Sequence, residues 1–352
     1  MKVLHVNFSF SQGGIDNMMN DIMLAQYQAG IEVSLMVVND QINKEVLDLI
    51  PKGIKAYFIR RPVGSKNPFY LLKIFLLIFF QIRPDVIHCH NRNLGKICHV
   101  IRHFMHCKSI LTVHDMSYDT RYYYLFDDVV AISKSVKEDI QKTYHQNNVR
   151  VIHNGIDFGK VLPRNIIEQN SPIRIVIVSR LDVEKKGHDI LLRAVSFLKN
   201  EGLGLHLDIV GNGNGLSKLE ELIEQLDIRD NVSILGSKSR EWVYCHLRDY
   251  DLLVQPSRYE GFGLTIVEGI AAKIPVLVSN IDGPKEITCN GTYGWMFSID
   301  NEKELAETIK TIISMNVEEL QNKIHNDYLY MKDHFSINAT ASKYIKLYQC
   351  AY

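Results

Sequence analysis

A pair of cations in the second half of the chain stands where it could hold an anionic ligand. Arg180 follows residues 173–179, an apolar run typical of a buried strand, and Lys186 precedes Gly187 and a predicted helix over 189–200. An arginine fork and a lysine point charge beside a helix N-terminus suit a diphosphate. A lone segment of this kind is more often a solvated charged loop before a capped helix. The interpretation therefore needs a second motif.

That second motif is the segment 257–268, SRYEGFGLTIVE, which again follows an apolar run, DLLVQP. Gly261 and Gly263 allow the backbone to turn tightly and to approach a ligand closely. A predicted helix beginning near Leu264 would direct its free N–H groups at the same place, and this suits a phosphate.

Two carboxylates accompany the glycines. Glu260 and Glu268 could accept hydrogen bonds from sugar or ribose hydroxyls. The alternative is structural: Glu268 would be an exposed helix residue, and Glu260 would only complement a helix N-terminus.

The elements that would position these residues follow from hydrophobic patterning. Short apolar runs alternate with longer stretches of helical period, which predicts β-α-β units and parallel sheets covered by helices on both faces. The predicted strands lie at 2–7, 33–38, 86–90, 110–114, 129–132, 173–179, 205–210, 232–235, 252–255 and 276–279, with helices at 16–29, 189–200 and 217–226. A polar segment around 157–172 separates two doubly wound α/β halves. The predicted domains are 1–165 and 166–331, followed by a helical tail over 332–352.

Composition excludes several classes of protein. A chain of 352 residues with 46% hydrophobic and 23% charged residues is ordinary for a globular enzyme and unlike a disordered, collagen-like or coiled-coil chain. The 40 Lys and Arg equal the 40 Asp and Glu, so no basic excess indicates a nucleic-acid partner. No two of the six cysteines have C-x-x-C spacing, and the N-terminus lacks a signal-peptide pattern. We expect reduced thiols and a cytoplasmic location.

The most apolar stretch, residues 69–80 (FYLLKIFLLIFF), allows two interpretations. Its 12 residues include Lys73, and roughly 20 apolar residues are needed to span a bilayer. The cations Arg60, Arg61, Lys66 and Arg83 flank it. A helix with an apolar face beside cations can lie on an anionic membrane. The alternative is a buried helix packed on the sheet.

Several motifs together resemble the retaining nucleotide-sugar glycosyltransferases of family four, which have the GT-B fold. In the second half they are EGFGLxxxE at 260–268, RLxxxKKG at 180–187 and LDIVGNG at 207–213, and VRVIHNGID at 149–157 precedes them. In the first half they are SQGGID at 11–16, VIHCHN at 86–91, LTVHD at 111–115 and AISKSVKEDI at 131–140. The resemblance implies two Rossmann-like domains facing across a cleft, with the C-terminal helix crossing back to the first.

The resemblance also implies roles for particular residues. Arg180 and Lys186 would bind the donor diphosphate and stabilise the charge that grows on it, Glu268 would hold the ribose, and Glu260 would lie near the transferred sugar. His114 would approach that sugar, although a strand-end histidine is as often structural. Backbone close to the donor would come from Gly13, Gly14, Gly211, Gly261, Phe262, Gly263, Leu264 and Thr265. One departure is Asp16, where the family often carries Glu.

The implied activity is transfer of a hexose, with retention of configuration, from a nucleoside-diphosphate sugar to a glycan or lipid-linked acceptor. The pathway would be surface polysaccharide assembly, such as lipopolysaccharide O-antigen or capsule, at the cytoplasmic face of the inner membrane. A UDP-sugar is favoured over a GDP-sugar, and no cofactor is expected. We hypothesise a same-face displacement; the alternative is Glu260 as a nucleophile. No metal is expected, and the one D-x-D string, Asp249–Asp251, runs into a predicted strand.

Other functions stay open at this point. A GT-B phosphorylase, a nucleotide-sugar epimerase or a noncatalytic nucleotide-sugar-binding subunit could carry similar motifs. A nicotinamide dehydrogenase is disfavoured, because the glycines at 211, 213 and 215 lack the G-x-G-x-x-G spacing.

Overall fold

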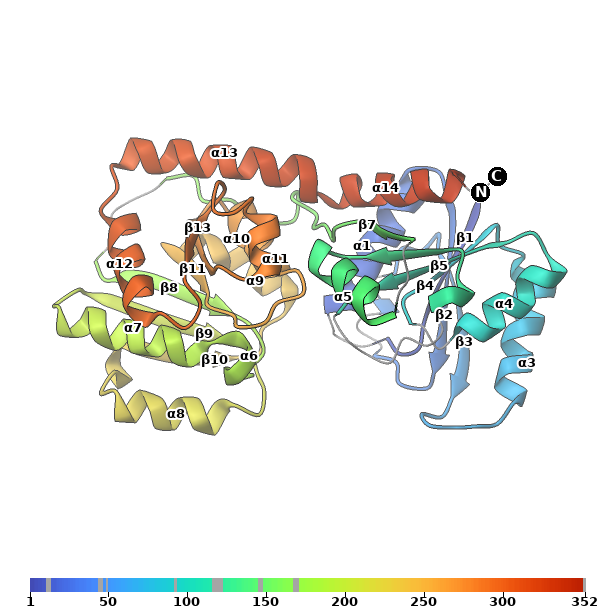
Figure 1. Cartoon of the computed structure of the whole chain (residues 1–352), viewed down its shortest axis with the longest axis horizontal. Coiled ribbons are helices and arrows are strands. Elements are labelled where there is room, and N and C mark those ends of the chain that lie inside the picture. Colours follow the sequence, from blue (N-terminus) through green and yellow to red (C-terminus); the bar gives the residue numbers. More distant parts are fainter. Residues whose placement is uncertain are drawn as a thin grey trace. The chain divides into compact units, whose positions relative to one another are not determined.

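The structure, a computed structural model, describes residues 1–10, 14–43, 47–48, 50–91, 94–115, 123–144, 148–166 and 171–350. The chain forms two compact units, one of Met1–Gly155 with Ile337–Tyr352 and the other of Ile156–Ser336. Each unit is built on its own parallel sheet (Figure 1). The predicted α/β class with two Rossmann-like domains is confirmed.

The first unit contains a seven-stranded sheet with the order β3-β2-β1-β4-β5-β6-β7. Its strands are β1 (Lys2–Asn7), β2 (Glu32–Asn39), β3 (Lys55–Arg61), β4 (Val86–Cys89), β5 (Lys108–Val113), β6 (Asp128–Ala131) and β7 (Val149–Val151). Its helices are α1 (Gly14–Gln28), α3 (Phe69–Leu76), α4 (Gly95–Phe104), α5 (Lys134–Tyr144) and α14 (Ile337–Gln349), and a π-helical turn over Leu77–Ile82 follows α3.

Helices α1 and α14 cover the centre of this sheet, and Figure 1 shows α14 beside α1. The apolar core there combines Met18 and Ile22 of α1 with Tyr344 and Tyr348 of α14, all 1% exposed or less. Large aromatic side chains contribute much of the buried apolar area in such a core. The last helix is therefore part of the first unit's core, although it follows the second unit in sequence.

The second unit contains a six-stranded parallel sheet with the order β10-β9-β8-β11-β12-β13. Its strands are β8 (Ile173–Val178), β9 (Leu205–Val210), β10 (Val232–Gly236), β11 (Leu252–Gln255), β12 (Val276–Ser279) and β13 (Trp295–Phe297). Its helices are α6 (Val183–Lys186), α7 (His188–Asn200), α8 (Leu216–Gln225), α9 (Arg240–His246), α10 (Leu264–Ala271), α11 (Asp282–Ile287), α12 (Glu302–Ile313) and α13 (Val317–Phe335).

The first boundary between the units differs from the predicted one. Residues 156–165 belong to the second unit, because the Leu162 amide donates to the carbonyl of Tyr244 at 3.0 Å and the Arg164 amide to that of Ala272 at 2.8 Å. The Arg164 guanidinium also lies 2.9 Å from Asp251. A polar sequence here reflects a segment anchored by hydrogen bonds rather than a free linker.

The last helix also begins later than predicted. Helix α13 ends at Phe335, and Ser336 is extended, with ψ 150°, before α14 begins at Ile337. Phe335 packs 5.8 Å from the ring of Phe262 in the second unit, whereas Ile337 lies in the core of the first. The sequence predicts the five residues before Ile337 as part of the tail because they continue the helical pattern.

The apolar stretch 69–80 is not a buried helix. In α3 and the turn after it, Ile74, Ile78 and Ile82 form one buried stripe with i, i+4 spacing. Phe75, Leu77 and Phe79 are half-buried. Seven large apolar side chains are exposed, namely Phe69, Leu71, Leu72, Leu76 and Phe80 of this stretch and Val100 and Phe104 of α4. We call these seven side chains the apolar patch. Among the helices that the structure describes, none has the length and apolar character to cross a membrane.

Arg164 offers a test of the first boundary. Its ion pair with Asp251 is 11% and 9% exposed, and the guanidinium also donates to the Tyr250 carbonyl at 2.8 Å. We expect Arg164→Ala to lower the free energy of unfolding by about 3 kcal/mol, because it removes the cation that offsets a buried carboxylate. Urea denaturation measures the loss. The matched change is Lys160→Ala, whose exposed 3.8 Å pair with Asp157 should contribute less than about 1 kcal/mol; equal losses would contradict the anchoring role.

Candidate functional site

The loop after β8 is shaped by a single helical turn and a glycine. Asp182 caps α6 by accepting a hydrogen bond from the Lys185 amide at 3.2 Å. Gly187 ends that turn with φ 68°, and a Cβ added there would lie 1.9 Å from the carbonyl oxygen of Pro256. Only glycine fits both the conformation and the contact. The loop after β8 therefore lies directly against the end of β11.

This contact brings together two of the predicted site residues. The Lys186 ammonium lies 2.6 Å from a carboxylate oxygen of Glu260, and both side chains are only 16% exposed. A charge-assisted hydrogen bond of this length between half-buried groups is stronger than an exposed ion pair. The pair joins the loops that follow β8 and β11.

Arg258 is a residue that the sequence analysis missed. Its guanidinium binds Asp189 in a bidentate manner, with two distances of 2.8 Å, and also contacts Asp300. The backbone amides of Arg258 and Tyr259 both donate to the carbonyl of Lys185, at 2.8 and 3.1 Å. Arg258 thus clamps the start of α7 to the loop that carries Glu260. A charged side chain two residues before Glu260, directly after a buried strand, was the available signal.

The contact with Arg258 also changes the pKa of Asp189. Partial burial acts to raise the pKa of this carboxyl, but the hydrogen bonds and charge of Arg258 outweigh burial and lower the pKa overall. The same contacts raise the pKa of Arg258. Both groups are therefore held in their charged forms.

The turn into α10 requires a second glycine. Gly263 has φ 103°, and a Cβ there would lie 2.8 Å from Ile266 and 3.3 Å from Cγ of Glu260. Thr265, in the first turn of α10, donates to the Val178 carbonyl at 3.4 Å. The helix begins at Leu264 as predicted.

The burial of two side chains bears on the predictions for this segment. Glu268 is 9% exposed, so the alternative of an exposed helix residue is wrong. Phe262 is 3% exposed and packs against Phe335, so its side chain belongs to the core and only its backbone could face a ligand.

Glycines also let the loop after β9 approach the loop after β8. A Cβ at Gly211 would lie 1.8 Å from the Ser179 carbonyl oxygen, and Cβ atoms at Gly213 and Gly215 would lie 2.8 and 2.6 Å from that of Leu181. A hollow of about 490 Å³ lies beside these loops, lined among others by Arg180, Asp182, Asn214 and Lys218. The exposed Arg180 thus borders a hollow, whereas Lys186 lies at the contact with Glu260.

The predicted site residues of the first unit do not form one cluster. Gly13 lies outside the described residues, and Gly14 is the first residue of α1. Asp16 is buried and accepts a hydrogen bond from Nδ2 of Asn7 at 2.8 Å. His114 follows β5, with Nε2 3.1 Å from Nδ1 of His90, and burial lowers the pKa of His114 to about 4.

The D-x-D string is engaged by protein groups. Asp249 lies 2.8 Å from Nδ1 of His246, and Asp251 pairs with Arg164. The Asp251 carboxylate also accepts a hydrogen bond from the Arg174 amide at 2.9 Å. These carboxylates anchor the end of α9 and the segment before β8.

Comparison with known families accounts for both halves of the chain. Residues 12–160 match the model described as Glycosyltransferase Family 4, and residues 162–328 match that of Glycosyl transferases group 1.

Individual proteins are similar over parts or all of the chain. An uncharacterized glycosyltransferase of Methanocaldococcus jannaschii is 27% identical over 68% of this chain and 68% of its own length. The putative colanic acid biosynthesis glycosyltransferase WcaL of Escherichia coli is 27% identical over 52% of this chain, which spans about half of that protein (48%). The structure of Anabaena HepE in complex with UDP and glucose matches with a TM-score of 0.80 and 18% identity, covering 99% of each chain.

The Arg258 clamp predicts a pH-dependent loss of stability. Because the pKa of Asp189 is lowered in the folded state, its stabilising contribution is complete above the ordinary value of 3.8 and is lost as the pH falls through the folded-state value. At neutral pH we expect Arg258→Met to cost about 2 kcal/mol.

Urea denaturation of wild type and Arg258→Met, from about pH 6 to about pH 2.5, checks this. The difference between the two proteins should narrow below the ordinary carboxyl pKa. Lys199→Met is the control, because its partner Asp227 is fully exposed. A difference that stays constant with pH would show that Arg258 acts by packing alone.

Proposed function

Because the chain belongs to the glycosyl transferases of group 1 and family 4, we propose that it transfers a hexose from a nucleoside-diphosphate donor, with retention of configuration. The observation that carries the proposal is the meeting of Lys186, Glu260 and the glycine-dependent start of α10 at the ends of β8 and β11. In open parallel sheets, ligands bind beyond the carboxyl ends of the strands. This edge offers a cation, a carboxylate and helix amides together.

The residues of this edge suit departure of a diphosphate. As the bond between sugar and phosphate breaks, negative charge grows on the leaving group, and fixed cations stabilise it most effectively where water is partly excluded. Lys186, 16% exposed, supplies such a charge, and Arg180 supplies a second from the same loop. These cations and the amides at the start of α10 would neutralise the phosphates without a metal.

Glu260 serves better as a hydrogen-bond acceptor than as a nucleophile. A carboxylate that pairs with an ammonium at 2.6 Å has much of its negative charge neutralised. We therefore favour a same-face displacement, in which the leaving phosphate accepts the proton of the attacking hydroxyl, and Glu260 accepts a hydrogen bond from the sugar. Glu268 would hold the ribose hydroxyls.

The relatives support a proposal for the donor and the pathway. HepE is seen with UDP and glucose, and WcaL is described as a colanic acid biosynthesis enzyme. We propose a UDP-hexose as the donor, and a glycan or lipid-linked acceptor in the assembly of a bacterial surface polysaccharide such as lipopolysaccharide O-antigen or capsule.

A lipid-linked acceptor fits the apolar patch of the first unit. Helix α3 is tied to β3 by a hydrogen bond from Lys73 to the Ile59 carbonyl at 3.3 Å, next to the exposed cation Arg60. Exposed apolar side chains beside cations bind anionic lipid surfaces by combined burial and attraction. We propose peripheral contact with the cytoplasmic face of the inner membrane.

Donor binding is tested by thermal unfolding with UDP, GDP or ADP in EDTA. We expect one nucleoside diphosphate to stabilise the wild type, by about 2.7 kcal/mol at a hundred times its Kd, and Arg180→Ala/Lys186→Ala to abolish the effect. Lys199→Ala, at the far end of α7, is the control. An unchanged shift in the double variant would remove the diphosphate assignment.

Transfer itself is tested with a UDP-sugar and glycan acceptors. Release of UDP only when acceptor is present supports a transferase over a phosphorylase or epimerase. A glycosyl adduct trapped on Glu260 and seen by intact-mass spectrometry would refute the same-face displacement.

Membrane contact is tested by flotation with anionic vesicles. Leu72→Asp/Phe80→Asp and Arg60→Glu/Lys66→Glu should each reduce the bound fraction several-fold, because they remove apolar burial and charge attraction respectively. Leu329→Asp changes an exposed leucine of α13 and is the matched control. Equal flotation of all four proteins, or none by the wild type, would refute the proposal.

A further inference from the structure

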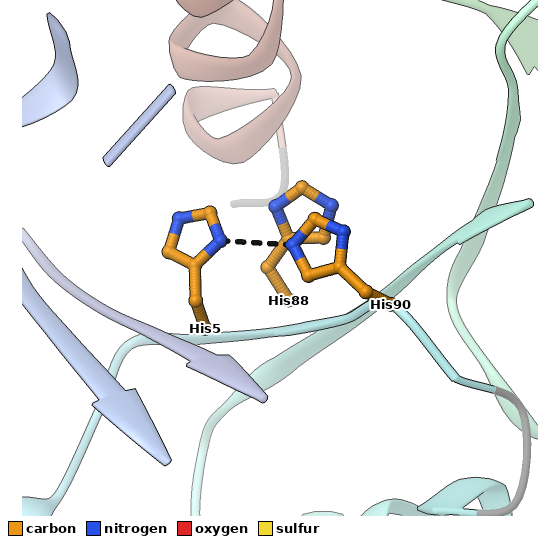
Figure 2. A group of neighbouring side chains, drawn as sticks. All are labelled: His5, His88 and His90. Carbon is orange, nitrogen blue, oxygen red and sulfur yellow. Dashed lines mark hydrogen bonds between the residues drawn. The ribbon is translucent and has the colours of Figure 1, made fainter. Parts of the chain in front are cut away.

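Four buried or half-buried histidines gather in the first unit, and the proposed function assigns a role to none of them. His5 lies on β1, His88 on β4, His90 just after β4 and His114 just after β5. Figure 2 shows the rings of His5, His88 and His90 on the same side of neighbouring strands, with a hydrogen bond joining His5 and His90. Because these rings are buried away from water, the partner of each ring nitrogen determines whether its hydrogen-bonding capacity is satisfied.

These side chains form a continuous chain of hydrogen bonds. Nε2 of His114 lies 3.1 Å from Nδ1 of His90, and Nε2 of His90 lies 3.1 Å from Nδ1 of His5. Nε2 of His5 then lies 2.8 Å from Oε1 of Gln26. The chain therefore runs from the end of β5, across β4 and β1, to helix α1.

Helix α14 anchors the far end of this chain. The Gln26 amide nitrogen donates to the Tyr348 hydroxyl at 3.0 Å, and that hydroxyl lies 2.7 Å from Nδ1 of His88. Nε2 of His88 lies 2.7 Å from the Thr112 hydroxyl, which lies 2.9 Å from the Tyr344 hydroxyl. The amide of Gln26 is thereby held between His5 and Tyr348.

The four imidazoles are neutral. Burial lowers the pKa of His5 and of His114 to about 4. Burial, reinforced by the neighbouring histidines, lowers the pKa of His88 and His90 well below the ordinary value. Each neutral ring has one N–H donor and one bare nitrogen that only accepts.

Neutrality, together with the orientation of the Gln26 amide, fixes the proton on each ring in turn. The Gln26 carbonyl oxygen can only accept, so Nε2 of His5 carries the proton and Nδ1 of His5 accepts. Nε2 of His90 must then donate to His5, which leaves Nδ1 of His90 to accept from Nε2 of His114. Nδ1 of His114 is left without a proton.

That last nitrogen has no protein partner. Nδ1 of His114 is buried and has no hydrogen-bond partner in the described part of the chain. A buried acceptor left unpaired costs free energy, and a ligand O–H could satisfy it. The proposed function supplies sugar substrates, which are rich in hydroxyl groups.

We propose that Gln26, His5 and His90 are positioning residues that keep Nδ1 of His114 free of a proton, so that it accepts a hydrogen bond from a hydroxyl of a sugar substrate. The hydrogen bond between the sugar hydroxyl and His114 rests on the proposed function. The arrangement of protons rests on the hydrogen-bond chain alone.

A metal site is the competing interpretation, because ligand atoms of His5, His88 and His90 lie within 4.8 Å of one another. Both ring nitrogens of all three histidines, however, already have hydrogen-bond partners. The group includes no carboxylate to offset the charge of a divalent ion, and an uncompensated buried charge is costly. The contacts therefore favour a neutral hydrogen-bond chain.

The arrangement of protons is tested on the full-length wild-type protein labelled with ¹⁵N-histidine. The chemical shift of a ring nitrogen separates protonated from bare nitrogens. We expect bare Nδ1 and protonated Nε2 in His5, His90 and His114, with signals assigned by single His→Asn variants. A protonated Nδ1 on His114 would overturn the proposal. So would displacement of the His5, His88 and His90 signals by one equivalent of Zn²⁺ bound at that cluster.

Gln26→Met tests the role of the chain in substrate binding. The change removes the acceptor that sets the direction of the chain, so part of His114 Nδ1 should become protonated, and kcat/KM for the sugar substrate that contacts it should fall about tenfold. Gln28→Met, at an exposed position of the same helix, is the matched control. Donors and acceptors that lack one hydroxyl identify this substrate: at the contacted position the penalty should be smaller in Gln26→Met than in the wild type, which a merely structural role would not produce.

The outcomes separate this proposal from the proposed function. Transfer that proceeds with an unchanged kcat/KM and unchanged hydroxyl penalties in Gln26→Met would overturn the positioning role while leaving the function intact. Expected ¹⁵N shifts without transfer from any donor would refute the function and the substrate contact, and would leave the proton arrangement standing.

Discussion

The candidate site of the second unit depends on the close approach of three backbone loops at one edge of a parallel sheet. Gly187 lies against the carbonyl of Pro256, Gly211 against that of Ser179, and a Cβ at Gly283 would lie 2.4 Å from that of Glu260. Larger side chains would push these loops apart, and Lys186 would no longer reach Glu260. Charge chemistry at this edge is therefore made possible by residues that have no side chain.

Much of this arrangement could be predicted because parallel sheets leave strong local patterns. The strands β1, β9, β11 and β12 have the predicted bounds, since each is a compact apolar run buried on both faces. Strands β3, β7 and β13 were missed. They lie at sheet edges, where β3 mixes Lys55, Arg60 and Arg61 with apolar residues, and β7 and β13 have only three residues each. The glycine and charge motifs identified Lys186 and Glu260, because each motif is a short, contiguous run of residues.

The features that the sequence did not predict are contacts between residues far apart along the chain. Arg258 acts through Asp189 and Asp300, and a local pattern does not show which charges will meet. The histidine chain joins β1, α1, β4, β5 and α14, and Tyr348 lies 260 residues from His88. An isolated histidine at a strand end predicts nothing about such partners. The end of α13 was not predicted either, because the helical pattern of the sequence runs through Ser336 without a break.

The place of α14 has a consequence for the order of folding during synthesis. Tyr344 and Tyr348 fill the core over β1 and β4, yet they are made only after all of Ile156–Ser336. The first unit leaves the ribosome with an open apolar surface and with unsatisfied polar groups at Gln26, His88 and Thr112. The second unit is contiguous and can complete its core first. The part of the chain synthesised first is thus the part completed last, and a nascent chain that ends before α14 is exposed to aggregation and proteolysis.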